Sequence, residues 1–241
     1  MKISINQKLE ELYVSKWENL KNYLNEIVEN ENYTIKPTNP LLLKHRDCEA
    51  YENSEIRLMI IGQETNDWGG CFHKEVDDMD EIIEIYTDFY SGYNFENHRG
   101  FFKNHFNSFL KLVKNKYPEK TISCFWNNVI KVGKANDKNI PPQYILELEQ
   151  KYFSVLKDEI EIIKPNVILF YTGRNYDKYV IHHFPELVKE DIIGFNSSEL
   201  QIFKLNNVDF AFRTPHPQRL HFQGKERYNK IYEKIISEII F

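Results

Sequence analysis

The sequence lacks the segments that mark membrane, secreted and repetitive proteins. It has no apolar run that is long and uncharged enough to span a bilayer, so we expect no transmembrane helix. The first residues, MKISINQKLEEL, have neither the apolar core nor the cleavage site of a secretory signal peptide, and none is expected. Internal repeats, low-complexity tracts and Gly/Ser linkers are also missing. With 241 residues, 41% of them hydrophobic, the chain is long enough to bury one large core.

The chain also has few cysteines and no net positive charge. The three cysteines, Cys48, Cys71 and Cys124, fit neither a disulfide framework nor a Cys-x-x-Cys metal site, so a reducing cytoplasm is the expected location. The net charge of −5 argues against a broad electrostatic hold on nucleic acid. The charged residues within 212–234 are nevertheless mostly basic, so a local basic face remains possible. The basic residues are Arg213, Arg219, Lys225, Arg227, Lys230 and Lys234, and the acidic ones are Glu226 and Glu233.

Hydrophobic periodicity predicts alternating helices and strands. Apolar residues recur every three or four positions from Asn6 to Asn30, which predicts a helix, and residues 32–39 read as a connector because they contain two prolines. Further helices are expected in DDMDEIIEIYTDFY, RGFFKNHFNSFLKLVKNKY, QYILELEQKYFSVLKDEIEIIK, RNYDKYVIHHF and KERYNKIYEKIISEII. Strands are expected at 57–61, at 122–126, in PNVILFYTG and in a hairpin that turns at Asn206-Asn207.

Strands that are apolar throughout and separated by helices indicate an α/β fold with a mostly parallel sheet covered on both faces. In such sheets the ligand lies beyond the carboxyl ends of the strands. Those ends are GQETN, WNNVIK, TGR and RTPHP. We therefore expect one pocket to collect residues from all four.

The GQETN end carries several groups with useful chemistry. Gly62 allows a tight turn and close approach of a ligand, and Glu64 can act as a base or orient a water. Gln63 and Asn66 can read a ligand by hydrogen bonds. The simpler interpretation is that a glycine and polar residues end many strands.

Two other strand ends supply candidates of a different kind. Asn128 offers a donor and an acceptor side by side, which suits the edge of an amide-like ring, although an Asn here can instead satisfy the backbone of a turn, as we expect for Asn127. His216 lies between two prolines that restrict where its imidazole points. The alternative for His216 is an ordinary surface-loop residue.

Taken in order, these segments resemble the uracil-DNA glycosylase superfamily. In that family a strand ends in a motif such as GQDPYH, a second strand end carries a base-reading Asn within an N-x-V-K segment, a third follows a Pro-x-x-I/V entry and ends in Gly, and a late HPS motif supplies a His. The matching segments here are Gly62-Gln63-Glu64, Asn128-Val129-Ile130-Lys131, Pro165 to Ile168 leading to Gly173, and His216-Pro217-Gln218. The resemblance implies a three-layer α/β/α sandwich with a central, mostly parallel four-stranded sheet over residues 51–241. Residues 1–50 would be an N-terminal helical extension.

The resemblance also implies a role for each candidate. Glu64 falls at the water-positioning residue, Asn128 at the reader of the uracil edge, and His216 at the group that hydrogen-bonds uracil O2. Leu220 falls where a side chain can wedge into the duplex, and Arg219, with Arg213 and Lys225, could contact phosphates. Phe72, Phe101 and Phe102 are the candidates for stacking on the flipped base. Asn66 replaces the Tyr that blocks the thymine methyl, and Thr65 replaces the Pro that stiffens the turn.

Two functional classes follow from these residues. The first is a monomeric DNA glycosylase that removes uracil or another deaminated or modified base from single- or double-stranded DNA. The second is a non-catalytic member of the same fold that binds a nucleotide, nucleic acid or protein. Neither needs a metal or organic cofactor, and three dispersed cysteines cannot supply the four ligands of the iron–sulfur cluster found in some branches.

Overall fold

The computed structural model describes residues 3–73, 78–90 and 100–240, and the chain divides into two compact units. Unit 1 combines Met1–Cys48, Glu64–Asn94 and Asn128–Ile163, and unit 2 combines Glu49–Gln63, Phe95–Asn127 and Lys164–Phe241. The expected boundary near residue 50 coincides with a change of unit. Residues 1–48, however, share their unit with two later segments of the chain.

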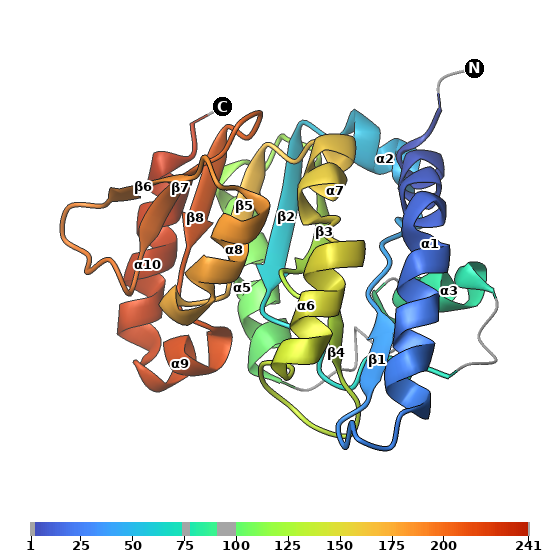
Figure 1. Cartoon of the computed structure of the whole chain (residues 1–241). Coiled ribbons are helices and arrows are strands. Elements are labelled where there is room, and N and C mark those ends of the chain that lie inside the picture. Colours follow the sequence, from blue (N-terminus) through green and yellow to red (C-terminus); the bar gives the residue numbers. More distant parts are fainter. Residues whose placement is uncertain (1–2, 74–77, 91–99, 241) are drawn as a thin grey trace. The chain divides into compact units, whose positions relative to one another are not determined.

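Unit 2 is built on a six-stranded, mostly parallel sheet in the order β3-β2-β5-β8-β7-β6 (Figure 1). The strands are β2 Ile56–Gly62, β3 Ile122–Asn128, β5 Val167–Phe170, β6 Val188–Asp191, β7 Gln201–Lys204 and β8 Phe210–Arg213. β2 and β8 both pair with β5 in parallel, and Val167 of β5 lies opposite Leu58 on one side and Phe210 on the other. β7 runs antiparallel to β8, and β6 runs antiparallel to β7.

The strands predicted from the sequence are confirmed, and so is the hairpin between β7 and β8. Asn207 has a φ of 62°, a left-handed conformation that Asn tolerates in tight turns. The sheet has six strands where four were expected, because the hairpin arm β7 extends it and β6 pairs with β7. β6 has the sequence Val-Lys-Glu-Asp and is largely exposed, so it shows no hydrophobic strand pattern and reads as a charged edge strand only once the fold is known.

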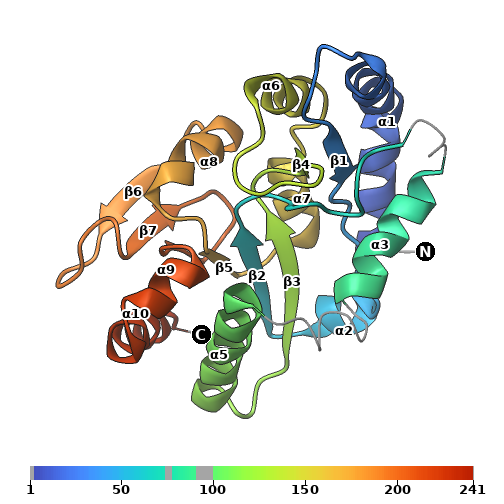
Figure 2. The same cartoon turned by 90° about the horizontal axis from the view of Figure 1, so that it is seen from below.

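Helices cover both faces of this sheet. α8 (Asp177–His183) lies on one face, and α5 (Phe101–Lys116), α9 (Pro217–Phe222) and α10 (Lys225–Glu238) lie on the other (Figures 1 and 2). α5, α9 and α10 contact one another, and α5 buries Phe106, Phe109 and Val113 at the spacing of one helical face. Coverage of both faces explains why β2 and β5 are buried along nearly their whole length.

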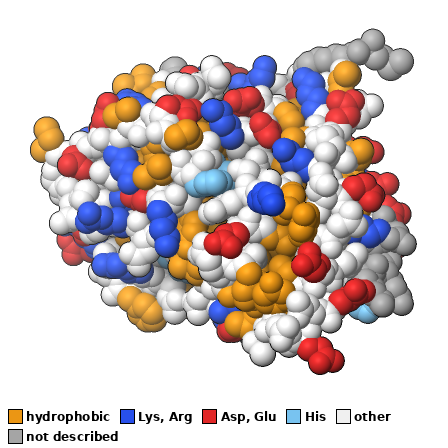
Figure 3. All heavy atoms as spheres, viewed as in Figure 1, with side chains coloured by type: hydrophobic (Ala, Val, Ile, Leu, Met, Phe, Trp, Pro, Cys, Tyr) orange, Lys and Arg blue, Asp and Glu red, His pale blue; other side chains and the backbone are white. Residues whose placement is uncertain are grey.

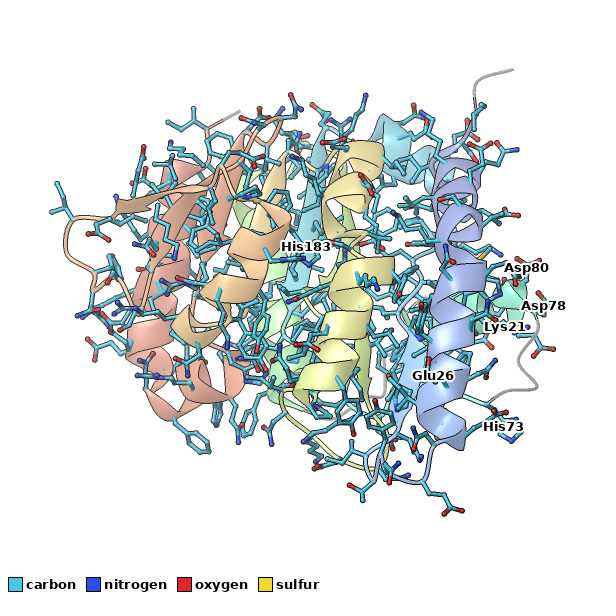
Figure 4. The ribbon with its side chains drawn as sticks, in the orientation of Figure 1. Lys21, Glu26, His73, Asp78, Asp80 and His183 are labelled. Atoms are coloured by element: carbon cyan, nitrogen blue, oxygen red, sulfur yellow. The ribbon has the colours of Figure 1, made fainter. Side chains whose placement is uncertain are left out.

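In unit 1 the expected long helix forms as α1, Ile5–Glu29. A capping box formed by Ser4 and Gln7 fixes its start. It contacts α6 (Gln143–Tyr152), α7 (Leu156–Ile163) and β1 (Pro37–Pro40) through a buried apolar stripe, while polar side chains such as Lys21 and Glu26 project from its other sides (Figure 4). Its buried residues are Ile5, Leu9, Tyr13, Trp17, Leu20, Leu24 and Ile27.

Unit 1 departs from the sequence prediction in two places. The expected connector contains β1, which pairs antiparallel with β4 (Val132–Lys134) in a two-stranded sheet, where both strands are edges and prolines are tolerated. The helix expected over QYILELEQKYFSVLKDEIEIIK is interrupted between α6 and α7, because Phe153 and Val155 leave the helical path and become fully buried.

The acidic start expected for the helix after residue 78 is confirmed in α3, Met79–Tyr90. Asp78 and Asp80 lie at the start of this helix (Figure 4), and the Asp78 carboxylate accepts a hydrogen bond from the Asp80 backbone N–H at 2.8 Å. Asp77 and Arg99, which open two of the expected helical segments, lie outside the described residues. Across the three described ranges, no helix is long and apolar enough to cross a membrane.

Candidate functional site

Unit 2 contains a cavity of about 150 Å³ beyond the carboxyl ends of three of its strands. Gln63 follows β2, residues 172–176 follow β5, Pro215 and His216 follow β8, and Ser198 and Arg219 complete the lining. The next sheet strand after β2 in sequence, β3, lies on one side of β2, and the one after that, β5, lies on the other. This reversal of strand order is the place where open α/β sheets bind ligands.

Gln63 and Thr172 form the floor of the cavity. The Gln63 side-chain amide donates through Nε2 to the Thr172 carbonyl at 2.7 Å, which orients the amide and leaves Oε1 as the acceptor for a ligand N–H. The Thr172 hydroxyl is buried and has no hydrogen-bond partner among the described residues. Because buried polar groups are nearly always satisfied, this hydroxyl is suited to bind a ligand or an ordered water.

His216 caps the short helix α9. Its Nδ1 accepts a hydrogen bond from the Gln218 backbone N–H at 3.3 Å, and burial lowers the pKa of the imidazole. The ring is therefore neutral at pH 7 and carries its proton on Nε2, since Nδ1 acts as the acceptor. A neutral imidazole with an Nε2–H group can donate a hydrogen bond without bringing a full positive charge.

The positive charge at the cavity comes from arginines. Arg174 and Arg219 are exposed residues of the lining, and the described lining residues include no Asp or Glu. Lys and Arg side chains gather on the left of Figure 3, the side on which Figure 1 draws α8 and α9, with acidic side chains among them. An overall acidic chain thus has a cationic cavity, which suits an anionic or phosphorylated ligand.

The backbone of the wall after β5 depends on Gly173. This residue has a φ of 70°, a left-handed conformation, and its N–H donates to the Thr214 carbonyl at 2.9 Å. The chain then enters a short 3₁₀ turn, Arg174–Tyr176, before α8. Gly62, which was expected to allow a tight turn, is the last residue of β2 and is not among the described glycines with positive φ.

A buried polar chain lies behind the cavity in unit 2. The Tyr171 hydroxyl donates to the Tyr232 hydroxyl at 2.8 Å, and the Tyr232 hydroxyl lies 2.7 Å from Nδ1 of His105. Burial, together with the charges of His221 and His216, lowers the pKa of His105 to about 4. Because Tyr171 directly precedes Thr172, this chain fixes the strand end that carries the cavity floor.

The sequence prediction was that four strand ends share one pocket, and the cavity in unit 2 collects three of them. Glu64, Asn66 and Asn128 belong to unit 1. There the Asn128 side-chain amide donates to the Glu64 backbone carbonyl at 3.1 Å, and Asn66 accepts from the Asn139 backbone N–H at 3.1 Å. Asn128 thus makes the turn-backbone contact that was weighed as its alternative role.

The aromatic candidates for base stacking are not among the described lining residues. Phe102 is half-buried against Trp126 and Tyr171, and Phe101 packs on residues of α9. Phe72 is fully buried in unit 1. The aromatic residue that lines the cavity is Tyr176.

Two of the residues expected at a DNA-binding surface are buried. Arg213 is fully buried and forms an ion pair with Asp177, so it is not part of an exposed basic face. Leu220 is also fully buried, because the inner side of α9 packs on α5 and α10, so it is not available as a wedge in this conformation. Arg219 and Lys225 are exposed, as contact with phosphate requires.

Several lining residues were missed by the sequence reasoning. Thr172 and Arg174 belong to the TGR strand end, which was expected at the pocket but given no individual roles, whereas Asn175 and Tyr176 follow that end and were not named. Ser198 comes from the loop before β7, for which the sequence carries no signal.

Within the described ranges, no group of three or more His, Cys, Asp or Glu side chains is placed to hold a metal ion. The three cysteines are free thiols. A comparison with models of protein families finds no match for this chain, and a search of curated proteins finds none either.

Proposed function

We propose that this protein is a DNA glycosylase-like protein, which binds an extrahelical base in the cavity of unit 2 and hydrolyses its N-glycosidic bond. The fold that we propose is the three-layer α/β/α sandwich of the uracil-DNA glycosylase superfamily, with β3, β2, β5 and β8 as its core strands. One observation carries the proposal: a small cationic cavity at the strand-order reversal is lined by both Gln63 and His216. We also propose that the protein is monomeric and cytoplasmic and that it needs no cofactor.

The size and chemistry of the cavity support a single base as the ligand. A cavity of about 150 Å³ can admit one six-membered ring and is smaller than the usual site for a drug-sized ligand. The Gln63 carbonyl can accept from a ring N–H, and the Asn175 amide and the Thr172 hydroxyl add donors and acceptors. Enzymes that act on bases read the pairing edge of a flipped nucleotide in this way. Arg174 and Arg219 suit the flanking phosphates.

The proposed reaction is attack of water on the anomeric carbon of the sugar. The C–N glycosidic bond breaks, and its electron pair leaves with the base, which becomes an anion. The Nε2–H of His216 donates to the base oxygen on which this charge develops, and one such donor typically contributes about 10²–10³ in rate. The attacking water releases a proton to solvent as its oxygen bonds to the anomeric carbon.

One observation favours the alternative, a non-catalytic protein that binds a nucleotide, nucleic acid or protein partner. The described lining residues of the cavity provide hydrogen-bond donors, acceptors and cations but no carboxylate that could act as a base. Such a set is sufficient for binding.

The test is incubation with single- and double-stranded oligonucleotides that carry uracil, hypoxanthine or xanthine, followed by alkaline cleavage at abasic sites. We expect abasic product with at least one substrate, and a rate lower by about 10²-fold or more for His216→Asn. Asn is a good N-cap and can still accept from Gln218, so this variant removes the Nε2–H donor and keeps the helix cap. Glu64→Gln and Asn128→Ala test the two candidates of unit 1.

Lys204→Met, at an exposed position of β7, is the matched control and should retain wild-type activity. Abasic product from none of the substrates, with folded protein, would favour the non-catalytic alternative. Equal rates for wild type and His216→Asn would exclude His216 from the reaction.

A further inference from the structure

Three aromatic rings meet in unit 2, two of them exposed on α9, the helix that follows His216, and the third, half-buried, at the start of α5. Phe222, the last residue of α9, is 74% exposed. Its ring centroid lies 5.7 Å from that of Phe101 and 6.0 Å from that of His221, and the Phe101 and His221 centroids are 4.7 Å apart. We call these three residues the Phe222 cluster. Large aromatic rings that remain exposed together commonly mark an interaction surface.

Two cations accompany the cluster in the chain. Arg219, one turn before Phe222 on α9, is also part of the cavity lining, and Lys225 opens α10. The segment 218–225 contains no Asp or Glu. In the described part of the chain, neither Arg219 nor Lys225 has an ion-pair partner.

Two acidic residues accompany these cations, Glu199 near Arg219 and Glu226 next to Lys225 in the chain, and each is engaged by another basic residue. Glu199 accepts two hydrogen bonds from Arg227, at 2.8 and 2.5 Å. Glu226 pairs with Lys230 at 2.7 Å. The surface around the Phe222 cluster therefore combines aromatic rings with a net positive charge, since four basic residues share two carboxylates. This composition complements nucleic acid whose bases are unpaired.

We propose that the Phe222 cluster, Arg219 and Lys225 bind a single strand of nucleic acid beside the cavity, so that single-stranded DNA is the preferred substrate form. This inference rests on the proposed function and defines its substrate class. Unpaired bases stack on the aromatic rings, and the cations contact the phosphates of the same strand. The bases of a duplex are already paired and stacked on each other, and their faces are not accessible to Phe222.

Binding to undamaged DNA tests this inference without requiring any base excision. Fluorescence anisotropy with the full chain compares a labelled, lesion-free oligothymidine strand with the same strand annealed to its complement. We expect wild type to bind the single strand more tightly than the duplex. Phe222→Ala should bind the single strand at least about tenfold more weakly than wild type, because stacking on one base typically contributes that much. Phe222→Tyr keeps an aromatic ring and should retain the affinity. Ile193→Ala, which removes another strongly exposed apolar side chain of unit 2, is the control and should bind as wild type.

The cations are tested by the dependence of affinity on salt. Arg219→Ala and Lys225→Ala should each reduce the slope of log K against log salt concentration by roughly 0.7, the value for one phosphate contact on a single strand. Equal affinity of wild type and Phe222→Ala, or equal affinity for the single strand and the duplex, would overturn the inference. So would a loss of self-association in Phe222→Ala, seen by sedimentation velocity, because the cluster would then contact a second copy of the chain.

The two proposals fail in different ways. Tight, Phe222-dependent binding without abasic product would reject catalysis and keep the binding surface. Abasic product with unchanged rates in Phe222→Ala on single strands would keep the catalytic proposal and reject the binding surface.

Discussion

Nε of Arg213 lies 3.3 Å from Oδ1 of Asp177, in a buried ion pair that joins β8 to the start of α8. Arg213 lies two residues before the lining residues Pro215 and His216, and Asp177 immediately follows the lining residues 172–176. Asp177 also pairs with Lys189 at 2.7 Å, and the Arg213 guanidinium donates to the Gln201 side-chain oxygen at 2.8 Å. The ion pair therefore links the two chain segments that line the candidate site after β5 and after β8.

Replacement of Arg213 by Met should lower the free energy of unfolding by about 3 kcal/mol, because the buried Asp177 carboxylate loses one of its two cationic partners and keeps only Lys189. Lys204→Met, which breaks an exposed ion pair with Glu190 in the same sheet, should lower it by less than about 1 kcal/mol. Urea denaturation measures both. The double variant Arg213→Met/Asp177→Leu should lose less than the sum of its single variants, because neither charge is then left buried. Equal losses of unfolding free energy for Arg213→Met and Lys204→Met would show that the buried Arg213–Asp177 pair stabilises the protein no more than an exposed pair does.

Glu149 should make unit 1 less stable as the pH rises. Its carboxylate accepts from the backbone N–H groups of Lys131 and Val132 at 2.9 and 2.8 Å, but burial dominates and raises its pKa to about 7 from 4.5. The folded state thus holds this proton more tightly than the unfolded state. The stability that protonated Glu149 contributes is complete below pH 4.5 and is lost as the pH rises through about 7. The free energy of unfolding should fall by at most about 3 kcal/mol over this range.

Glu149→Gln should therefore flatten the dependence of the unfolding free energy on pH over this window, as followed by urea denaturation at a series of pH values. Glu147→Gln, at an exposed position of the same helix α6, is the control and should leave the dependence unchanged. An unchanged pH profile in Glu149→Gln would contradict the assignment of the titration to this residue.

His105 should act in the opposite direction. Its pKa is lowered to about 4 from 6.5, mainly by burial, so the unfolded state binds the proton more tightly. The associated stability is complete above pH 6.5 and is lost as the pH falls through about 4. His105→Asn can still accept from Tyr232 but does not titrate, and it should remove this acid destabilisation in pH-dependent urea denaturation. The exposed His182→Asn on α8 is the control, and a profile of His105→Asn that matches it would reject the prediction.

Gly133 should tolerate no side chain, for reasons of space. A Cβ atom at this position would lie 1.7 Å from the Thr65 carbonyl oxygen, and the Gly133 N–H donates to the Thr38 hydroxyl at 2.9 Å. Gly133→Ala should lower the free energy of unfolding by about 3 kcal/mol or more. Gly194→Ala, where no atom lies within 4 Å of the added Cβ, should cost about 1 kcal/mol through its left-handed φ alone. Comparable losses in the two variants would show that the contact at Gly133 relaxes.

Part of the candidate site could be predicted because it depends on local sequence. Gln63 and His216 each follow a strand directly, and apolar strands between helices imply that their carboxyl ends face one edge of the sheet. Arg219 was expected to contact phosphate from the resemblance and from the basic composition of residues 212–234. Tyr176 and Ser198 were not predicted, since a turn of 3₁₀ helix and a loop before β7 place them at the cavity.

The sequence by itself determined the order of most helices and strands, the burial of the sheet on both faces and two of the residues that line the cavity at its edge, because these follow from the periodicity of apolar residues and from the residues that end the strands. Only the tertiary structure decided which side chains near that edge face solvent. Arg213 is buried because the fold brings Asp177 to it, and Leu220 is buried while Phe222 is exposed because α9 packs one side on α5 and α10. Contacts between residues distant in the sequence fix these outcomes, and a local pattern does not contain them.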